Sequence, residues 1–316
     1  MDNNPTQTQA AIGDNMPQTI KLTYRFMYDL VVKMLFAQNP DLLQNLVAML
    51  LRISPESIEE FVVTNTEIAP ETVGEKFCRL DINMIVDGRH INLEVQIADE
   101  KDYIERATYY LAREYSSSLP ASGKYKDLPQ TIIISIIDFI QFEGSPEYYS
   151  EFMLLEVKRY DLLTDKLCAI YCELPKLPKV ININGGNSVI DSNNEDSILK
   201  LWLSLFRAKT EKDLSEIEEL GVDVLSKAVA AYRSVTASDK FKELERIRSK
   251  ARHDEASAVY NAEERGRQEG RKEGRKEGRR EGVFQVARNL LGIGRPLVEI
   301  ITATGLTREE IENLRK

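Results

Sequence analysis

The amino-acid sequence predicts an α/β protein, with a mixed β-sheet flanked by helices and a helical C-terminal extension. Three observations predict this class. Apolar residues recur at helical spacing near the start of the chain, two alternating runs meet at a turn within 77–97, and the run at 131–139 is apolar on both parities. A run without alternation is typical of a strand that is covered on both faces. Helices and strands that alternate along the chain indicate a layered domain.

The first elements are expected to be helical. Residues 21–36 place apolar side chains at helical spacing, among them Tyr24, Met27 and Leu30. A second stripe follows Pro40-Asp41, which is a helix-start signal. We therefore expect two helices or one broken helix, followed by a short strand at 61–63.

The stretch 77–97 predicts a β-hairpin. Asp87-Gly88 is a strong signal for a two-residue turn, and a turn of this length fixes the register of the two strands. The pairs expected on the apolar face from this register are Val86 with Arg89, Met84 with Ile91, Ile82 with Leu93 and Leu80 with Val95. On the opposite, polar face the same register sets Asp81 directly against Glu94, with Gln96 beside Glu94.

The carboxylate pair has two interpretations. A hairpin often keeps one polar face in water, and the alternation taken alone favours that solvated face. However, two opposed carboxylates repel unless something compensates them, and Mg²⁺ bound by carboxylate oxygens is one such compensation. The backbone carbonyl of Val95 would add a third protein oxygen. The polar face is also nearly free of lysine and carries no threonine, and a helix follows at once that is placed to roof it.

The rest of the first half completes the sheet. A helix at 100–119 is expected to begin after a cap at Asp99. Its expected buried stripe is Ile104, Ala107, Leu111 and Tyr115. The central strand at 131–139 follows, and then a second hairpin from Glu151 to Glu173. Cys168 and Cys172 have the spacing of a zinc-ligand pair, but with no second pair after them they are better explained as small core residues.

Five segments are expected along the chain. They are a disordered lead-in at 1–20, a mixed α/β domain at 21–185, a helical region at 186–265, a Gly/Arg/Glu tetrapeptide repeat at 266–282 and a short helical tail at 283–316. The tail carries a capping-box pattern that begins at Thr307. The lead-in has neither the basic nor the apolar region of a signal peptide, and no apolar run is long enough to span a membrane. With sparse cysteines as well, we expect a cytoplasmic protein.

Composition excludes several kinds of chemistry. The chain has two histidines, which fit neither a catalytic triad nor a zinc-binding helix motif, and it has no phosphate-binding glycine loop. Carboxylates are therefore the side chains that remain as candidates for catalysis. The net charge of −9 argues against a generally basic nucleic-acid surface, so contact with DNA would come from local patches of lysine and arginine.

The residues also resemble a known family. The segment RLDI at 79–82, the Asp-Gly turn and INLEVQ at 91–96 resemble the PD-(D/E)XK nuclease motif in its Asp…Glu-x-Gln form, which is typical of the Rpn family of recombination-promoting nucleases and putative transposases. Asp29 to Lys33 resembles that family's opening helix, and Glu105-Arg106 with Gly123-Lys124-Tyr125 resembles its later helix and loop. The resemblance covers about residues 21–175.

The resemblance implies a restriction-endonuclease-like fold and a set of roles. Asp81 and Glu94 would hold Mg²⁺, with Mn²⁺ or Ca²⁺ as alternatives, and Gln96 would replace the lysine of the wider superfamily. Arg106 would contact the scissile phosphate, or would instead pair with Asp102 on its own helix. Asp29 and Lys33 would face the site, or would instead form a surface pair four residues apart.

The function expected from these residues is that of a Mg²⁺-dependent DNA endonuclease linked to recombination or transposition. The rival is a nuclease-fold module that binds DNA or protein and has little or no turnover. For the glycine repeat, three roles stay open. They are self-association into a homo-oligomer, phosphate contact and a solvated linker. The arginines concerned are Arg267, Arg271, Arg275 and Arg279.

Overall fold

The computed structural model describes residues 20–64, 82–99, 101–119, 122–178 and 194–314. The chain divides into two compact units, Met1–Arg246 and Ile247–Lys316. None of the helices in the described ranges combines the length and the apolar character that a membrane crossing requires.

The first unit is built on one mixed sheet, as the sequence predicts. Its described strands are β1 (Phe61–Val63), β2 (Ile82–Val86), β3 (Arg89–Gln96), β4 (Thr131–Ile137), β5 (Tyr149–Leu155) and β6 (Leu162–Glu173). They lie side by side in the order β1-β2-β3-β4-β6-β5. The neighbours β3, β4 and β6 are parallel, whereas β1, β2 and β5 join antiparallel. Antiparallel hairpins therefore flank a parallel centre.

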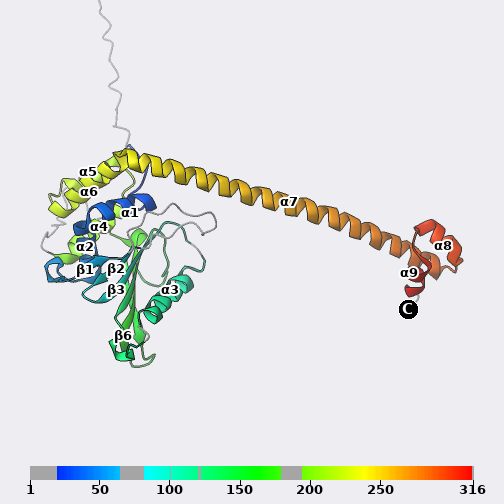
Figure 1. The fold of residues 1–316 in the computed structure, drawn as a ribbon, viewed down its shortest axis with the longest axis horizontal. Coiled ribbons are helices and arrows are strands. Elements are labelled where there is room, and N and C mark those ends of the chain that lie inside the picture. The colour runs from blue at the N-terminus through cyan, green and yellow to red at the C-terminus, as the bar shows by residue number, and fades with distance from the viewer. Residues whose placement is uncertain (1–19, 65–81, 100, 120–121, 179–193, 315–316) are drawn as a thin grey trace, which may run out of the picture. The chain divides into compact units, whose positions relative to one another are not determined.

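Helices cover both faces of this sheet. The described α-helices of the unit are α1 (Asp29–Gln38), α2 (Pro40–Leu51), α3 (Tyr103–Ser117), α4 (Glu195–Arg207), α5 (Glu211–Glu218), α6 (Asp223–Ala237) and the start of α7, which begins at Asp239. Short 3₁₀ turns lie at Pro55–Ser57, Tyr125–Asp127 and Leu174–Lys176. Figure 1 shows α3 on one side of the sheet and α1, α2 and α4 on the other.

The main core lies on the α1–α2–α4 side. Alternate residues of the strands, including Leu93 and Ile134, are fully buried there, together with Trp202 of α4. The helices α4, α5 and α6 contribute to the same core as α1 and α2. Because β3 and β4 send every second side chain into this core, their remaining side chains must face α3.

The hairpin between β2 and β3 has the predicted register. Asp87 and Gly88 have φ values of 48° and 72°, and two positive φ values in succession characterise the turn that joins such strands tightly. Val86 pairs with Arg89, Met84 with Ile91 and Ile82 with Leu93. The expected pair of Leu80 and Val95, like that of Asp81 and Glu94, lies outside the described residues.

The opening helix begins later than expected. The helix α1 starts at Asp29, and Tyr28 before it is extended, with φ −66° and ψ 128°. The apolar spacing at 21–28 has a different cause, because this segment packs aromatic rings into the core. The ring centroid of Tyr24 lies 4.9 Å from that of Phe241, and that of Phe26 lies 5.0 Å from that of Phe206.

The cysteines of β6 are core residues and not a zinc pair. Cys168 and Cys172 are free thiols buried in the main core. Burial first, and then the charge of Glu151, raises the pKa of Cys168 to about 12, which keeps the thiol protonated at neutral pH. No cluster of three His, Cys, Asp or Glu occurs within the part of the chain that the structure describes.

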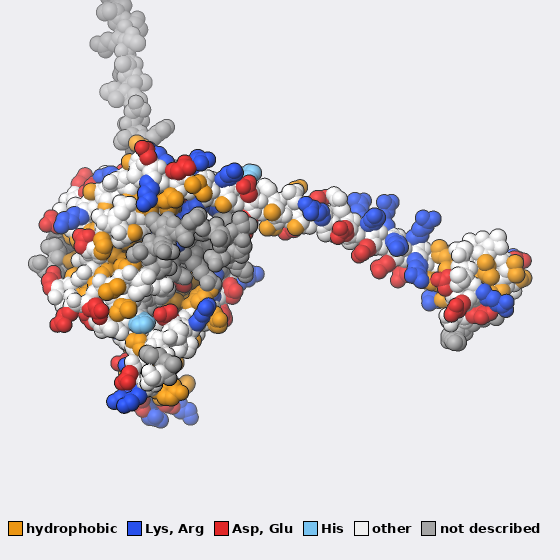
Figure 2. Space-filling view, viewed as in Figure 1, with side chains coloured by type: hydrophobic (Ala, Val, Ile, Leu, Met, Phe, Trp, Pro, Cys, Tyr) orange, Lys and Arg blue, Asp and Glu red, His pale blue; other side chains and the backbone are white. Residues whose placement is uncertain are grey.

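The second unit is helical. It contains the remainder of α7, which ends at Gly292, together with α8 (Leu297–Thr304) and α9 (Arg308–Asn313). Ala287, Ile300 and Ile311 form a small core between these three helices. The capping box predicted at Thr307 is present at the start of α9. The glycine repeat lies within α7, where Figure 2 shows basic side chains along one side of the helix and acidic ones along another.

Candidate active site on the α3 face of the sheet

Glu94 is a buried carboxylate at the centre of the sheet. Its neighbours Leu93 and Val95 point into the main core, so strand alternation turns Glu94 to the opposite face, toward α3. The residue is 7 % exposed. Its partner across the parallel pair of β3 and β4 is Ser135, which is also buried. A carboxylate in such a place needs compensating hydrogen bonds or a cation.

One of these compensating groups is Tyr103, the first residue of α3. Its hydroxyl donates a hydrogen bond to Oε2 of Glu94 over 3.2 Å, and its ring is 1 % exposed. Burial, and after it the negative charge of Glu94, raises the pKa of Tyr103 far above its ordinary value of 10.0. Tyr103 is therefore a neutral donor that holds one carboxylate oxygen in place.

An aromatic cluster shields this contact from water. The ring of Tyr103 meets the edges of Phe139 and Tyr171 at centroid distances of 5.8 Å and 6.3 Å. Burial first, and then the charge of Glu94, raises the pKa of Tyr171 to about 12. The surroundings of Glu94 are thus poor in water, which strengthens its electrostatic interactions with nearby groups.

Tyr103 is absent from the buried stripe that the sequence predicts for this helix. The helix begins at Tyr103 after Asp102, so Asp99 is not its cap. Within the predicted stripe Ala107 is fully buried, whereas Ile104, Leu111 and Tyr115 are only partly buried. The spacing of Tyr103, Ala107 and Tyr110, four and then three residues apart, is the signal that could have found the true inner face.

Gln96 lies on the same face as Glu94, two residues along β3. It is 5 % exposed, and its Nε2 donates to the backbone carbonyl of Ala98 over 3.1 Å. Its backbone carbonyl accepts from the amide of Asp138 over 3.0 Å. The side chain is therefore held at the carboxyl ends of β3 and β4, beside Glu94.

An ion pair at this edge of the sheet is not predicted by the sequence pattern. Arg25 forms an ion pair with Asp138, with 2.7 Å between Nη1 and Oδ2, and both side chains are largely buried. Because Asp138 also binds the backbone of Gln96, this pair links the segment before α1 to the end of the strand that carries the site.

The supporting residues predicted from the resemblance lie on two helices. The guanidinium of Arg106 lies over the ring of Tyr103, 5.3 Å from its centroid. Because Tyr103 itself contacts Glu94, Arg106 is linked to Glu94 through Tyr103. Asp29 and Lys33 lie on α1 and form an ion pair of 3.3 Å. That contact has the four-residue spacing given above for their alternative role, but both side chains are largely buried and do not form a surface pair. Their participation in the site stays a prediction.

The donor chemistry of the site fits a divalent cation. Glu94 offers a carboxylate and Gln96 an amide side chain, and oxygen ligands of these kinds are those that Mg²⁺ prefers. Asp81, the other predicted carboxylate, lies outside the described residues, as does any contact that it makes. The side chain of Val95 is buried in the main core, and the role of its carbonyl as a ligand stays a prediction.

The comparisons with known proteins agree with the fold and with the motif. A family model described as PD-(D/E)XK nuclease family transposase matches residues 26–262, which is more than half of the chain and includes β2, β3 and α3. Comparisons with curated proteins and with solved structures found no match. On the strength of the family match, the chain belongs to the PD-(D/E)XK nuclease family transposases.

Proposed function

We propose that this protein is a Mg²⁺-dependent DNA endonuclease that hydrolyses phosphodiester bonds in recombination or transposition. The observation that carries the proposal is the buried Glu94, held by Tyr103 on a sheet face that α3 covers, in a chain of a nuclease family. A solvated polar face, the alternative that the alternation favours, would leave this carboxylate exposed to water.

In this proposal Asp81 and Glu94 hold the metal, with the backbone carbonyl of Val95 as a third protein ligand. Mg²⁺ is the expected ion, and Mn²⁺ or Ca²⁺ are alternatives. When bound, the ion would supply a Lewis acid for the phosphate and lower the pKa of a bound water. Because the protein supplies few ligands, water and a substrate phosphate oxygen would complete the shell.

The remaining residues orient these groups. Tyr103 fixes one oxygen of Glu94. Arg106, whose guanidinium lies over the same ring, would contact the scissile phosphate, since a guanidinium binds phosphate oxygens through two parallel hydrogen bonds. Gln96 offers neutral hydrogen bonds where a lysine would offer a charge, so it would position a water molecule without taking its proton.

A cleavage assay tests the site. The full-length protein would be incubated with plasmid and with single-stranded DNA in Mg²⁺, with EDTA as the metal-free control. We expect Glu94→Gln and Asp81→Asn each to reduce cleavage at least 100-fold, a magnitude typical of removing a charged group at a reacting centre. Glu147→Gln, at an exposed carboxylate in the loop between β4 and β5, is the matched control and should cleave normally. Cleavage that survives both site substitutions would refute the assignment.

A non-catalytic DNA- or protein-binding module is the second candidate. The observation in its favour is the amide of Gln96, which is neutral and already donates to Ala98. If the wild type binds DNA but cleaves none of the substrates with any divalent ion, while Gln96→Lys does cleave, the fold has kept the site and lost its turnover.

The proposed partner is DNA, and the proposed compartment is the cytoplasm, which suits the free thiols of Cys168 and Cys172. We also propose that copies of the chain associate through the C-terminal helical region. Comparing the mass in solution of the full chain with that of a chain truncated after residue 265 tests this, and an unchanged oligomeric state would exclude it.

A further inference from the structure

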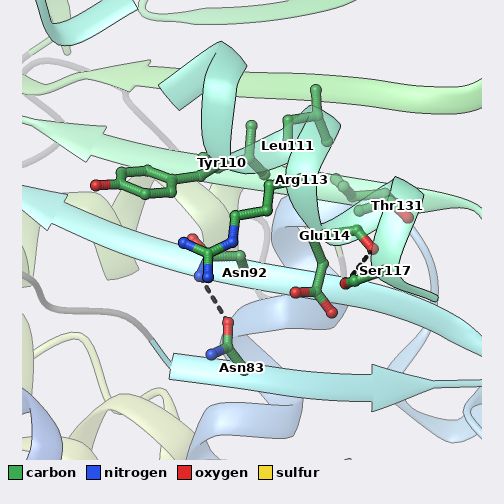
Figure 3. A pocket seen from close by; sticks show the side chains of 10 residues that line it. Asn83, Asn92, Tyr110, Leu111, Arg113, Glu114, Ser117 and Thr131 are labelled. Carbon is green, nitrogen blue, oxygen red and sulfur yellow. Dashed lines mark hydrogen bonds between the residues drawn. The ribbon is translucent and has the colours of Figure 1, made fainter. Parts of the chain in front are cut away.

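A polar pocket lies beside Glu94 on the same face of the sheet. It has a volume of about 350 Å³ and is bounded by α3 and the strands β2, β3 and β4. Asn83 and Asn92 line it from the strands, and Tyr110 and Arg113 line it from the helix (Figure 3). The volume falls within the range of small-molecule binding sites.

The pocket is close to the proposed reaction centre. Asn92 precedes Glu94 by two residues on β3, and both side chains are on the face that α3 covers. Side chains two residues apart on a strand are separated by roughly 7 Å. A group that enters the pocket would therefore be a direct neighbour of a phosphate bound at Glu94.

Two buried polar atoms at the pocket have no hydrogen-bond partner in the part of the chain that the structure describes. Nδ2 of Asn92 donates to Oδ1 of Asn83 over 2.6 Å, which leaves Oδ1 of Asn92 as an acceptor without a donor. The hydroxyl of Thr131 is the second, in a residue that is 1 % exposed. Buried polar groups are normally satisfied, so two such atoms at one pocket indicate a ligand that supplies the partners.

A positive charge lies at the same pocket. Arg113 is exposed, and Figure 3 shows its guanidinium pointing from α3 toward Asn83 and Asn92. The carboxylate of Glu114 also lines the pocket, and it contacts Nδ1 of His90 at 3.3 Å. The pocket thus combines a cation at its rim with hydrogen-bonding groups at its base, which is the combination that a nucleotide requires.

We propose that this pocket binds the base of an unpaired nucleotide next to the scissile phosphate, and that Arg113 holds the phosphate of that nucleotide. This inference rests on the proposed function, because it takes DNA as the substrate. The free acceptor on Asn92 would accept from the exocyclic amino group of adenine, cytosine or guanine. Thymine has no exocyclic amino group, and its one edge donor, N3–H, lies between two carbonyl oxygens that would repel Oδ1 of Asn92, so the pocket would discriminate against it.

The base must be unpaired because the pocket is concave and lies between a helix and a sheet. A base inside a duplex is stacked and has its edge hydrogen-bonded to its partner, so it would have to leave the helix to enter. Single-stranded or frayed DNA presents bases without that cost. The proposed preference is therefore for unpaired DNA with an amino-bearing base at this position.

Binding of labelled single-stranded oligonucleotides to the full-length protein, measured in EDTA so that nothing is cleaved, tests the proposal. Oligo-dA and oligo-dC are expected to bind about 10-fold more tightly than oligo-dT, the factor that one hydrogen bond of ordinary strength provides. Asn92→Leu and Thr131→Val should each reduce this preference. Arg113→Gln should weaken binding of all three oligonucleotides by a similar factor, because phosphate contacts carry no sequence information.

The matched control is Arg159→Gln, since Arg159 is an exposed arginine whose side chain pairs with Asp161 in the turn between β5 and β6. It should leave both the affinity and the preference unchanged. If the protein binds all three oligonucleotides equally and the pocket variants are neutral, the pocket holds only water and the inference is overturned while DNA remains the substrate. If no oligonucleotide binds, both the inference and the proposed DNA substrate fail.

Discussion

The hydroxyl of Tyr103 donates to Oε2 of Glu94 across the interface between α3 and the sheet, over 3.2 Å. This hydrogen bond connects the first residue of a helix to the central carboxylate of a strand. Both residues are buried, so breaking their hydrogen bond would leave polar atoms without a partner at a cost in free energy. The position of α3 and the position of the proposed metal ligand are therefore coupled.

The first prediction concerns this contact. Tyr103→Phe keeps the ring packed against Phe139 and Tyr171 but removes the donor. Because it leaves a buried acceptor on Glu94 with one partner fewer, we expect the free energy of unfolding to fall by about 1–3 kcal/mol. We also expect cleavage to fall about 10-fold, with a higher Mg²⁺ concentration at half-maximal rate, since ~1.4 kcal/mol of lost positioning corresponds to a factor of ten.

Tyr109→Phe is the matched control for this measurement. Tyr109 is on the same helix, but its side chain is 62 % exposed. Urea denaturation and Mg²⁺ titration of cleavage should give wild-type values for it. A Tyr103→Phe protein that is less stable but has an unchanged Mg²⁺ dependence would show that Tyr103 is structural and does not position Glu94.

The second prediction concerns the turn that sets the register of the site. Oδ1 of Asp87 accepts from the backbone amides of Glu59 and Glu60, at 2.9 Å each, while its backbone has a positive φ. The hydrogen bond from Glu60 is the main cause that lowers the pKa of Asp87 below 3.8. A lowered pKa in the folded state means that this contribution is present at neutral pH and is lost as the pH falls toward and below that value.

We therefore expect Asp87→Ala to be clearly less stable than the wild type at pH 7, and Asp87→Asn to be close to it. Asparagine keeps an oxygen acceptor and tolerates a positive φ, whereas alanine does neither. On acidification from pH 5 to pH 3 the wild type should lose more stability than Asp87→Asn, which has no proton to bind. Thermal denaturation across this pH range measures both differences, and equal losses would contradict the assigned role.

The register of this hairpin could be predicted from sequence because it depends on local chemistry. The turn residues Asp87 and Gly88 and the alternation of β2 and β3 leave a single pairing that buries the apolar face. The burial of Glu94 could be argued only from the helix that follows. The start of α1 could not be predicted from spacing, because aromatic residues such as Tyr24 and Phe26 have helical spacing while they pack from a segment of bends and turns. Non-local packing of this kind is not visible in a periodic pattern.

The contacts that complete the site are likewise non-local. The ion pair of Arg25 with Asp138 joins residues 113 positions apart, and the hydrogen bond between Asn83 and Asn92 depends on the two strands being adjacent. The hydrogen bond between Asn83 and Asn92 follows from the predicted register, in which these two residues are directly opposed, so it can be predicted from the sequence. The ion pair of Arg25 with Asp138 depends on how the opening segment crosses the ends of the strands, which no local signal specifies.

The third prediction is a gain of stability. Thr131→Val replaces a buried hydroxyl that has no hydrogen-bond partner among the described residues with a methyl group of similar size. Removing an unsatisfied buried polar group relieves its desolvation penalty, so we expect the free energy of unfolding to rise by about 1 kcal/mol. The same variant is expected to show a weaker base preference. Urea denaturation measures the change, and a loss of stability would indicate that ordered water already satisfies this hydroxyl.

The fourth prediction is a pH dependence in the alkaline range. Burial raises the pKa of Cys168 from 9.0 to about 12. Between these values the unfolded chain loses the thiol proton while the folded chain keeps it, so stability falls as the pH rises, by at most about 1.4 kcal/mol per pH unit from this group. Cys168→Ala should show a shallower fall between pH 8 and pH 11 in chemical denaturation. Parallel pH profiles would contradict the raised pKa.

The last prediction concerns the glycine repeat of α7. Five glycines recur every four residues from Gly266 to Gly282, and a Cβ added at any of them would meet nothing within 4 Å. A four-residue step exceeds one helical turn by about 40°. Each of the four positions of the repeat (glycine, arginine, a variable residue and glutamate) therefore forms its own stripe, which winds gradually around the helix. The glycine stripe thus has arginine on one side and glutamate on the other.

In a parallel pair of such helices related by a two-fold axis, the arginine stripe of each copy faces the glutamate stripe of the other copy. An antiparallel pair would instead bring like charges together.

Replacing Gly270, Gly274 and Gly278 together by alanine separates the roles proposed for the repeat. Alanine favours the helix by about 0.5–1 kcal/mol per position, so thermal melting of helicity should shift upward. If copies of the chain pair through the glycine stripe, the added methyl groups hold the helices apart, and sedimentation should show a weaker oligomer despite the more stable helix. Gly144→Ala, at an equally open glycine of the first unit, should change neither quantity. A stabilised helix with an unchanged oligomeric state would leave the repeat without a part in association.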